Sequence, residues 1–289
     1  MAAWGAGRLT ARGKMLDYAC WGPPPDTAPT LVLLHEGLGC VALWRDFPER
    51  LAAATGLGVV AYSRAGYGQS DPADLPRPLD YMTREAVQVL PEVLERLGLR
   101  NYALVGHSDG ATIAAEYAGR IDDRRLDGLV LIAPHFFTEA GGLAEIAAAR
   151  DAYRSGTLRQ RMAKYHRDPD TAFHGWNDAW LAPGFRDWTV AAVIDGWQVP
   201  CLAVQGADDQ YGSLDQVRII EARSPAAVEL RVVAAAGHAP HLERQTEVLE
   251  TVAGFCSRVV RENPVRRRAN PETGRSMHNI ALPGGRLVS

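Results

Sequence analysis

The sequence predicts an α/β protein with a doubly wound, mostly parallel sheet. Short apolar runs rich in branched residues alternate with longer segments of helical periodicity, and LVLLH at residues 31–35 is the clearest run. These runs show no polar alternation, as expected for strands of a parallel sheet that is covered on both faces. Strands that alternate with helices indicate crossover units, and such units build a doubly wound sheet.

The predicted elements begin with a hairpin over residues 7–21, followed by buried strands at 31–35 and 58–62. A helical pattern then covers residues 83–97, from TREAVQVL to the glycine that follows it. Pro91 lies inside this pattern, and proline lacks the N–H that a helix interior needs. The sequence therefore predicts a kink or a break in this helix.

The second half continues the same alternation. We expect strands at 102–106, 128–133, 200–205 and 229–234, and helices at 110–119 and near 242–260. More than sixty residues separate the strand that ends at Ala133 from the strand near Cys201, which is far longer than an ordinary connection. This segment is helical in pattern and aromatic, so it predicts an inserted element.

The chain is accordingly divided into three parts. We predict an α/β core formed by residues 1–134 and 198–262, a helical lid over residues 135–197, and a flexible basic tail over residues 263–289. The tail carries five Arg against one Glu and shows little apolar periodicity. Such a composition is typical of chain that does not pack into a core.

Composition narrows the function classes. The 289 residues are 47% hydrophobic and 22% charged, enough for one large core or two modest ones. A net charge of −3 gives no electrostatic reason to expect nucleic acid or an anionic membrane as the main partner. No apolar stretch approaches the roughly 20 residues of a membrane span, and the first residues lack the apolar region of a signal peptide. We expect a cytoplasmic protein.

The cysteines indicate neither a disulfide framework nor a metal centre. The four of them are scattered, without C-x-x-C or other ligand spacing, at Cys20, Cys40, Cys201 and Cys256. Reduced thiols and no metal site are therefore expected.

The segment GHSDG at residues 106–110 lies between a predicted strand and a predicted helix. In that context G-x-S-x-G predicts a nucleophilic Ser108 at the mouth of the sheet, whereas elsewhere it is only a glycine-rich turn. Because the turn is sharp, glycine at 106 and 110 has a steric reason. Asp109 begins the helix, and its backbone N–H points to where an oxyanion would form.

With this motif the chain resembles the α/β-hydrolase family over about residues 7–260. The family order is nucleophile, acid, histidine, with the last two on loops after late strands. The resemblance implies that the acid is Asp209, within GADDQYG, with Asp208 as the alternative. A simple turn is the non-functional interpretation of this segment.

The resemblance likewise implies that the base is His238, within AAGHAPHLE, and His241 is its decoy. Taken alone, a histidine such as His238 is more commonly a loop residue with satisfied hydrogen bonds. A serine hydroxyl is weakly nucleophilic until a base accepts its proton, and the base needs a carboxylate to fix its tautomer. Three such residues in the family order favour the catalytic interpretation.

Two further loops resemble those of the family. EGLGC at residues 36–40 corresponds to the loop that supplies the second oxyanion donor, for which Gly37 is our first choice and Leu38 our second. Glu36 replaces the usual glycine, and we expect its side chain to point away because a negative charge opposes a developing oxyanion. SRAGYGQSDP at residues 63–72 is similar to the R-G-x-G-x-S loop, to which we assign a structural role and no catalytic one.

The substrate pocket is expected to be aromatic. Phe173, Trp176 and Trp180 recur at i, i+3 and i+7, so they share one face of a helix, either as a roof over an apolar substrate group or as the core of the lid. The residues we expect to line the pocket are Leu38, Trp44, His107, Phe136, Trp176 and Trp180.

The resemblance thus implies a serine hydrolase that cleaves a small or medium carboxylic ester through an acyl-enzyme intermediate. Ser108 would attack, His238 would transfer the proton, Asp209 would orient His238, and the N–H groups of Gly37 and Asp109 would hold the oxyanion. No cofactor is expected, and the expected partner is a small ester or lactone. Lactonase, carbon–carbon bond hydrolase and non-catalytic small-ligand receptor are the alternatives. Epoxide hydrolases and haloalkane dehalogenases fit less well because they place Asp at the nucleophile position.

Overall fold

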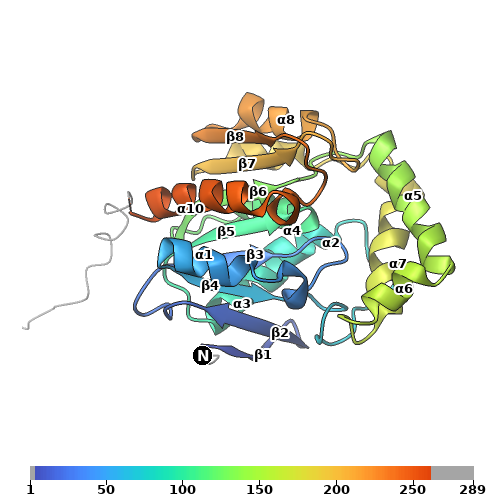
Figure 1. Cartoon of the computed structure of the whole chain (residues 1–289), viewed down its shortest axis with the longest axis horizontal. Coiled ribbons are helices and arrows are strands. Elements are labelled where there is room, and N and C mark those ends of the chain that lie inside the picture. Colours follow the sequence, from blue (N-terminus) through green and yellow to red (C-terminus); the bar gives the residue numbers. More distant parts are fainter. Residues whose placement is uncertain (1–3, 262–289) are drawn as a thin grey trace, which may run out of the picture.

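A computed structural model describes residues 4–261, and within this range it contains one eight-stranded sheet (Figure 1). The strand order is β1-β2-β4-β3-β5-β6-β7-β8. The two N-terminal strands, β1 (Ala6–Ala11) and β2 (Lys14–Trp21), form the predicted antiparallel hairpin. β2 also pairs antiparallel with β4, and every later pair is parallel. The prediction of a mostly parallel sheet is confirmed.

The six remaining strands lie close to their predicted positions. They are β3 (Thr30–Leu34), β4 (Gly58–Tyr62), β5 (Tyr102–His107), β6 (Leu126–Ile132), β7 (Cys201–Gly206) and β8 (Val228–Val233). Every residue of β3 is buried: Leu31 and Leu33 face one hydrophobic layer, and Val32 and Leu34 face the other. Because neighbouring side chains of a strand point to opposite faces, a strand between two layers needs apolar residues throughout.

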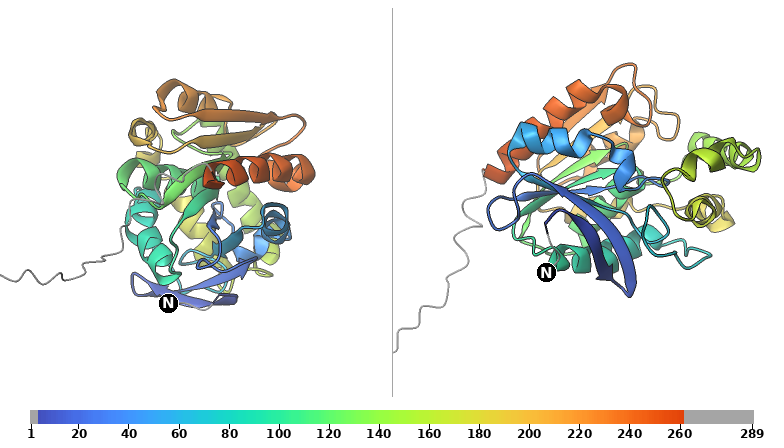
Figure 2. Two further views of the ribbon diagram at one scale, coloured as in Figure 1. Left: turned by 90° about the vertical axis from the view of Figure 1, so that its left-hand side faces the viewer. Right: turned by 60° about the horizontal axis from the view of Figure 1, so that its bottom comes forward.

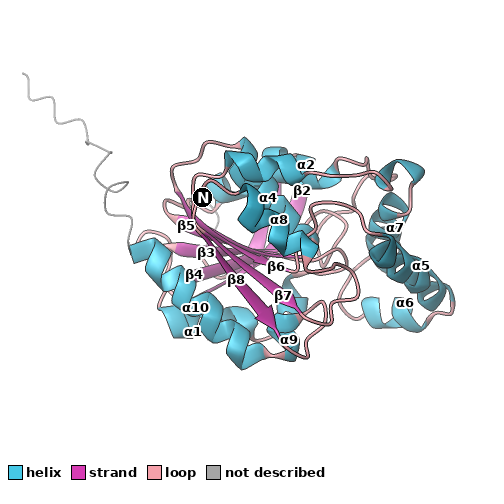
Figure 3. Ribbon diagram, turned by 90° about the horizontal axis from the view of Figure 1, so that it is seen from above, coloured by secondary structure: helices cyan, strands magenta, loops and turns pink. Residues whose placement is uncertain are grey.

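Helices cover both faces of the sheet (Figure 3). One layer contains α1 (Phe47–Thr55) and α10 (Gln245–Arg261), which pack against each other. The opposite layer contains α2 (Tyr81–Arg84), α3 (Leu90–Arg96), α4 (Asp109–Arg120) and α8 (Asp215–Arg223). Short helices η1 (Val41–Trp44) and α9 (Pro240–Glu243) lie in the loops after β3 and β8. The doubly wound arrangement is therefore also confirmed.

The helix predicted at 83–97 is interrupted, as Pro91 indicated. α2 runs into a π-helical turn, η2 (Glu85–Val89), and α3 then starts afresh with Pro91 in its first turn. Proline fits there because the first N–H groups of a helix have no intrahelical acceptor. The nine-residue helices α1 and α8 were not predicted, since each is too short to show a sustained apolar period.

The long connection between β6 and β7 is helical. It contains α5 (Ala140–Arg154), α6 (Thr157–Met162), α7 (Pro169–Trp180), η3 (Pro183–Phe185) and η4 (Ala191–Gly196). Figures 1 and 2 show α5, α6 and α7 together beyond one end of the sheet. The domain boundaries remain predictions, and the basic tail over residues 263–289 lies outside the described residues. Within residues 4–261, no helix has the length and apolar character that a membrane span requires.

Candidate active site

Ser108 lies at a sharp turn between β5 and α4. Its backbone has φ 54° and ψ −119°, a left-handed conformation that side chains rarely adopt. The two flanking glycines are fixed by close backbone contacts: a Cβ on Gly106 would lie 2.3 Å from the carbonyl oxygen of Gly110, and one on Gly110 would lie 1.9 Å from that of Leu34. Only glycine fits these two positions, and the Ser108 side chain is thereby presented at the carboxyl edge of the sheet.

Three side chains from separate loops form one hydrogen-bonded chain. His238, in the loop after β8, places its Nε2 2.9 Å from Ser108 Oγ. Its Nδ1 lies 2.9 Å and 3.0 Å from the two carboxylate oxygens of Asp209, in the loop after β7. With the His238 proton on Nδ1, Nε2 is free to accept the proton of the Ser108 hydroxyl.

Asp209 rather than Asp208 is the carboxylate that meets this histidine. Its oxygens also accept hydrogen bonds from Gln205 Nε2 at 2.7 Å and from the Tyr211 N–H at 2.8 Å, whereas Asp208 is exposed. Burial raises the pKa of Asp209, but the bonds to His238 and Tyr211 outweigh it, so its pKa lies below the usual range. The group is therefore ionised at neutral pH.

His241 does not take the place of His238. It is buried against aromatic rings, 5.2 Å from Trp44 and 4.6 Å from His107 between ring centroids. Burial, together with His238, lowers the pKa of His241 to about 3. A ring held neutral inside a packed cluster serves as core, which matches its assignment as the decoy.

In the loop after β3, the Gly37 N–H is a free backbone donor at the cavity. The N–H of Leu38 donates to the Glu36 carboxylate at 2.5 Å, whereas the N–H groups of Gly37 and Asp109 donate to no atom of the described residues. The carbonyl of the Glu36–Gly37 peptide lies 3.0 Å from Arg64 Nη2 and 2.7 Å from His35 Nδ1. Since the C=O and N–H of a trans peptide point in opposite directions, these contacts fix the direction of the Gly37 N–H.

His35 has a defined tautomer. Its Nε2 accepts from the Arg64 N–H at 3.0 Å, so the ring proton resides on Nδ1, where it donates to the Glu36 carbonyl. Burial, followed by Arg64, lowers the pKa of His35 well below its usual value, which keeps the ring neutral.

Arg64 connects the two segments that carry the free N–H groups. It is 1% exposed, donates to the His35 carbonyl at 2.5 Å, and lies 3.8 Å from the Asp109 carboxylate. That carboxylate also accepts from Tyr81 Oη at 2.5 Å, and Tyr81 in turn accepts from Trp180 Nε1 at 3.0 Å. The 63–72 loop, predicted to be structural, thus contributes a side chain that holds this site together.

Ser108 borders a small cavity of about 80 Å³. The predicted pocket residues Leu38, Trp176 and Trp180 line it, as do Gly37 and Asp109. Trp44 and His107, also predicted to line the pocket, line a neighbouring cavity of about 410 Å³ instead. Both cavities are lined by Glu36, Tyr211 and His238. The predicted pocket is therefore divided between two spaces that meet at His238.

Two expectations about the pocket are wrong. Phe136 lines neither cavity: it is fully buried, with its ring centroid 6.2 Å from that of Trp197, and Phe137 lines the small cavity instead. The backbone is extended here, where Phe137 pairs with Thr189, so neighbouring side chains point to opposite sides. Glu36, expected to point away, lines both cavities.

Sequence reasoning missed several lining residues. His135 follows β6 and Tyr211 follows β7, while Glu139, Leu143 and Ile146 come from the start of α5. The positions of His135 and Tyr211 directly after predicted strands could have indicated them, because loops after parallel strands gather at one edge of the sheet. The residues of α5 carried no such signal, since the packing of that helix decides which way they face.

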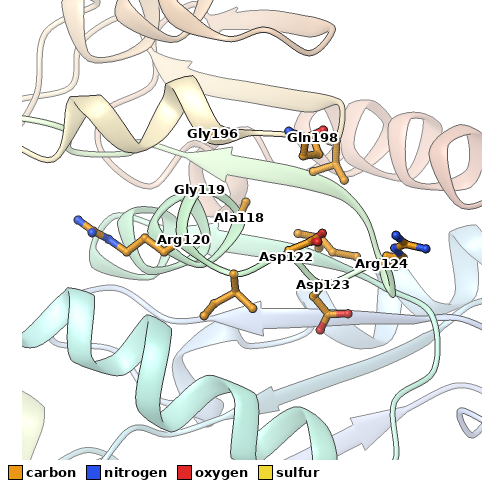
Figure 4. A pocket seen from close by; sticks show the side chains of 11 residues that line it. Ala118, Gly119, Arg120, Asp122, Asp123, Arg124, Gly196 and Gln198 are labelled. Atoms are coloured by element: carbon orange, nitrogen blue, oxygen red, sulfur yellow. The ribbon is translucent and has the colours of Figure 1, made fainter.

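A larger cavity, of about 690 Å³, lies at the far end of α4 from Ser108 (Figure 4). No serine or histidine is among its lining residues. Its carboxylate at Asp123 is already bound by Arg125 at 2.6 Å and by the hydroxyls of Tyr102 and Tyr117 at 2.6 Å and 2.7 Å. The nucleophile, base and free N–H groups all belong to the smaller cavity.

Comparisons with known proteins agree with this geometry. A family model described as the alpha/beta hydrolase family matches residues 31–251. The chain is 31% identical over 118 residues to epoxide hydrolase B of Mycobacterium tuberculosis, covering 40% of this chain and 32% of that protein. It is 31% identical over 125 residues to a proline iminopeptidase of Lactobacillus delbrueckii, covering 41% and 42% respectively. The matched stretch spans less than half of either relative.

Solved structures resemble the chain over more of its length. A proline iminopeptidase from Mycobacterium smegmatis has a TM-score of 0.67 at 19% identity, covering 88% of this chain and 98% of its own. An enol-lactonase from Burkholderia xenovorans has a TM-score of 0.66 at 18% identity, covering 86% and 99%. These two likenesses are evidence for the fold. Because the family model spans well over half of the sequence, the chain belongs to the α/β-hydrolase family.

Proposed function

We propose that this protein is a serine hydrolase that cleaves a small or medium carboxylic ester through an acyl-enzyme intermediate. The observation that carries the proposal is the continuous contact from Ser108 through His238 to Asp209, with both hydrogen-bond distances at 2.9 Å. A nucleophile, a base and an orienting carboxylate in this sequence are the elements of covalent acyl transfer.

In this mechanism Ser108 Oγ attacks the ester carbonyl carbon while His238 Nε2 takes the hydroxyl proton. The C–O bond to the alcohol then breaks, and the imidazolium returns its proton to the departing oxygen. A water molecule attacks the acyl-enzyme in the same way, which releases the acid and restores Ser108. Asp209, ionised at neutral pH, stabilises the imidazolium in both halves.

The N–H groups of Gly37 and Asp109 would hold the negative oxygen of each tetrahedral intermediate. Neither N–H group donates to another acceptor among the described residues, which supports this role. Arg64 would act through them as a positioning residue, because it contacts the Glu36 carbonyl on one side and faces the Asp109 carboxylate on the other. Donors fixed before the reaction need no reorganisation in the transition state.

The two cavities favour a compact acyl group with a larger leaving group. The space next to Ser108 holds about 80 Å³, and the space beyond His238 holds about 410 Å³. A lactone would undergo the same acyl chemistry, with the alcohol retained on the acyl chain. Selectivity between open esters and lactones is thus a matter of cavity shape.

The test is hydrolysis of p-nitrophenyl esters of increasing acyl length and of a panel of lactones. Wild type is compared with Ser108→Ala and with Ser224→Ala, a serine remote from the site in the loop after α8. We expect turnover in wild type and Ser224→Ala and its loss in Ser108→Ala. Full turnover in Ser108→Ala would refute the mechanism, and absence of turnover in all three would favour a ligand-binding receptor.

A further inference from the structure

We propose that the small cavity accepts an acyl group bearing a compact ammonium group beside its carbonyl carbon, and that Glu36 binds this ammonium. The inference rests on the proposed function, because it names the substrate class of the same site. It starts from an acidic residue in the loop that carries the Gly37 N–H, a position where a negative charge disfavours an oxyanion.

Glu36 is a carboxylate inside the reacting cavity. One of its oxygens accepts the Leu38 N–H, and the other has no donor among the described residues. No Lys or Arg lines this cavity, and Glu36 forms no ion pair within residues 4–261. A half-buried carboxylate with one unpaired oxygen and no ion pair is stabilised by a ligand that brings a positive charge to it.

The buried charges beneath the loop do not cancel that of Glu36, and the two arginines of the larger cavity that it also lines, Arg45 and Arg161, are exposed. Beneath the loop, the guanidinium groups of Arg64 and Arg77 act on the buried carboxylates of Asp109 and Glu85. Two cations thus already face two carboxylates, before Glu36 is added. The net charge of this group favours one additional cation in the cavity.

The other carboxylates at the cavity have more partners than Glu36, and each uses one oxygen for them while its second oxygen has no donor among the described residues. Glu139 accepts from the Ser213 N–H at 2.9 Å and from Gln216 Nε2 at 2.7 Å. Asp109 accepts from Tyr81 and faces Arg64. Burial raises the pKa of Glu36 above its usual value, against the opposing effects of the Leu38 N–H, His238 and Arg64. A bound ammonium would, like His238, lower the pKa of Glu36 and so favour its ionised form.

The walls suit a small cation. Trp176, Trp180 and Tyr211 line the cavity together with Glu36, and aromatic faces attract ammonium groups through their ring quadrupoles. A volume of about 80 Å³ admits a few heavy atoms beyond the carbonyl, so the amine must sit close to it. An α-aminoacyl ester has this chemistry.

Glu36 therefore acts in opposite directions on two kinds of substrate. With a neutral acyl group, its charge opposes the developing oxyanion held by the adjacent Gly37. With an ammonium beside the carbonyl, the carboxylate binds the cation and the two charges cancel. Glu36→Gln keeps an acceptor for the Leu38 N–H and removes only the charge, so it separates these effects.

The experiment compares L-alanine methyl ester with methyl isobutyrate, in which a methyl group replaces the ammonium. Initial rates are followed by titration of released acid at pH 7 for wild type and Glu36→Gln. We expect wild type to prefer the alanine ester in kcat/KM by about tenfold or more, the value of one charge-assisted hydrogen bond. In Glu36→Gln the alanine ester should lose that factor, while the isobutyrate ester is cleaved at least as fast as by wild type.

Glu145→Gln is the matched control. Glu145 is an exposed carboxylate on α5 that contributes to the raised pKa of Tyr211, but it does not line the cavity. The variant should leave the ratio of the two esters unchanged. Equal ratios in wild type and Glu36→Gln would overturn the inference while leaving the hydrolase proposal intact, provided that Ser108→Ala abolishes both activities. If Glu36→Gln does not fold, a wild-type preference for the isobutyrate ester overturns the inference by itself. Absence of turnover of both esters by wild type would overturn it too.

Discussion

His238 places its Nε2 2.9 Å from Ser108 Oγ, whereas His241, three residues further along the same loop, packs 5.2 Å from the Trp44 ring. The two histidines therefore have different tasks although both lie near the reacting serine. One is part of the hydrogen-bonded chain that activates the nucleophile, and the other belongs to an aromatic cluster beside it.

The first prediction concerns these two histidines. His238→Gln should lower kcat by about 10³-fold or more, because no other group of the described residues is hydrogen-bonded to Ser108 Oγ. His241→Leu should lower kcat less than about tenfold, since an apolar side chain of similar size keeps the cluster packed. Steady-state kinetics on one p-nitrophenyl ester measures both, and comparable losses in the two variants would contradict the assignment.

The second prediction separates the neighbouring aspartates. Asp209→Asn retains the shape of the side chain but removes the charge that stabilises the imidazolium, so kcat should fall by about 10²- to 10⁴-fold. Asp208→Asn is the matched control, being exposed and adjacent in sequence. It should behave as wild type, and a larger loss in Asp208→Asn would transfer the acid to that residue.

The third prediction concerns Arg64. Arg64→Met removes both contacts to the carbonyls of residues 35 and 36 and removes the ion-pair partner of the buried Asp109 carboxylate. We expect kcat to fall by about 10- to 10³-fold with little change in KM, because the free N–H groups act on the transition state.

Stability should fall in the same variant, by about 3 kcal/mol or more. Kinetics are therefore normalised to the folded fraction, measured by circular dichroism at the assay temperature. Arg64→Lys keeps the charge without the two-pronged geometry, so its kcat should lie between those of wild type and Arg64→Met. An unchanged kcat in the folded fraction of Arg64→Met would exclude the positioning role.

The fourth prediction is a pH dependence of stability. Burial, together with His238, lowers the pKa of His241 to about 3, against about 6.5 in an unfolded chain. Between these values the unfolded state binds a proton that the folded state does not, so this histidine reduces the free energy of unfolding as pH falls. The reduction is about 1.4 kcal/mol per pH unit below about pH 6.

His241→Leu removes this titration. The free energy of unfolding of the variant minus that of wild type should therefore increase by about 1.4 kcal/mol between pH 6 and pH 5. Urea unfolding at pH 7.5, 6 and 5 measures it. A difference that stays constant over this range would show that His241 is protonated inside the fold.

The residues that sequence predicted well share one property: they follow strands of the sheet in the order of the family that the chain resembles. Ser108, Asp209 and His238 each follow a parallel strand, and the carboxyl ends of parallel strands meet at one edge. The position of such a residue is thus determined once the strands are recognised. The break before Pro91 was likewise predictable, because it depends on covalent chemistry.

What sequence did not predict depends on the direction of side chains. Phe136 and Phe137 are the same residue type, so the sequence does not distinguish them. Only the pairing of Phe137 with Thr189 decides which one lines the cavity. The inward position of Glu36 depends on its bond to the Leu38 N–H, and the role of Arg64 depends on contacts with a loop about thirty residues away. Such tertiary contacts leave no period in the sequence.

The central claim is that Ser108 is activated as a nucleophile, and covalent labelling with a fluorophosphonate tests it most directly. Peptide mass spectrometry locates the adduct in wild type, in His238→Gln and in Ser108→Ala. We predict one adduct on Ser108, formed at least about 10²-fold more slowly in His238→Gln and absent in Ser108→Ala. Labelling at another residue, or an equal rate on Ser108 without His238, would contradict the account.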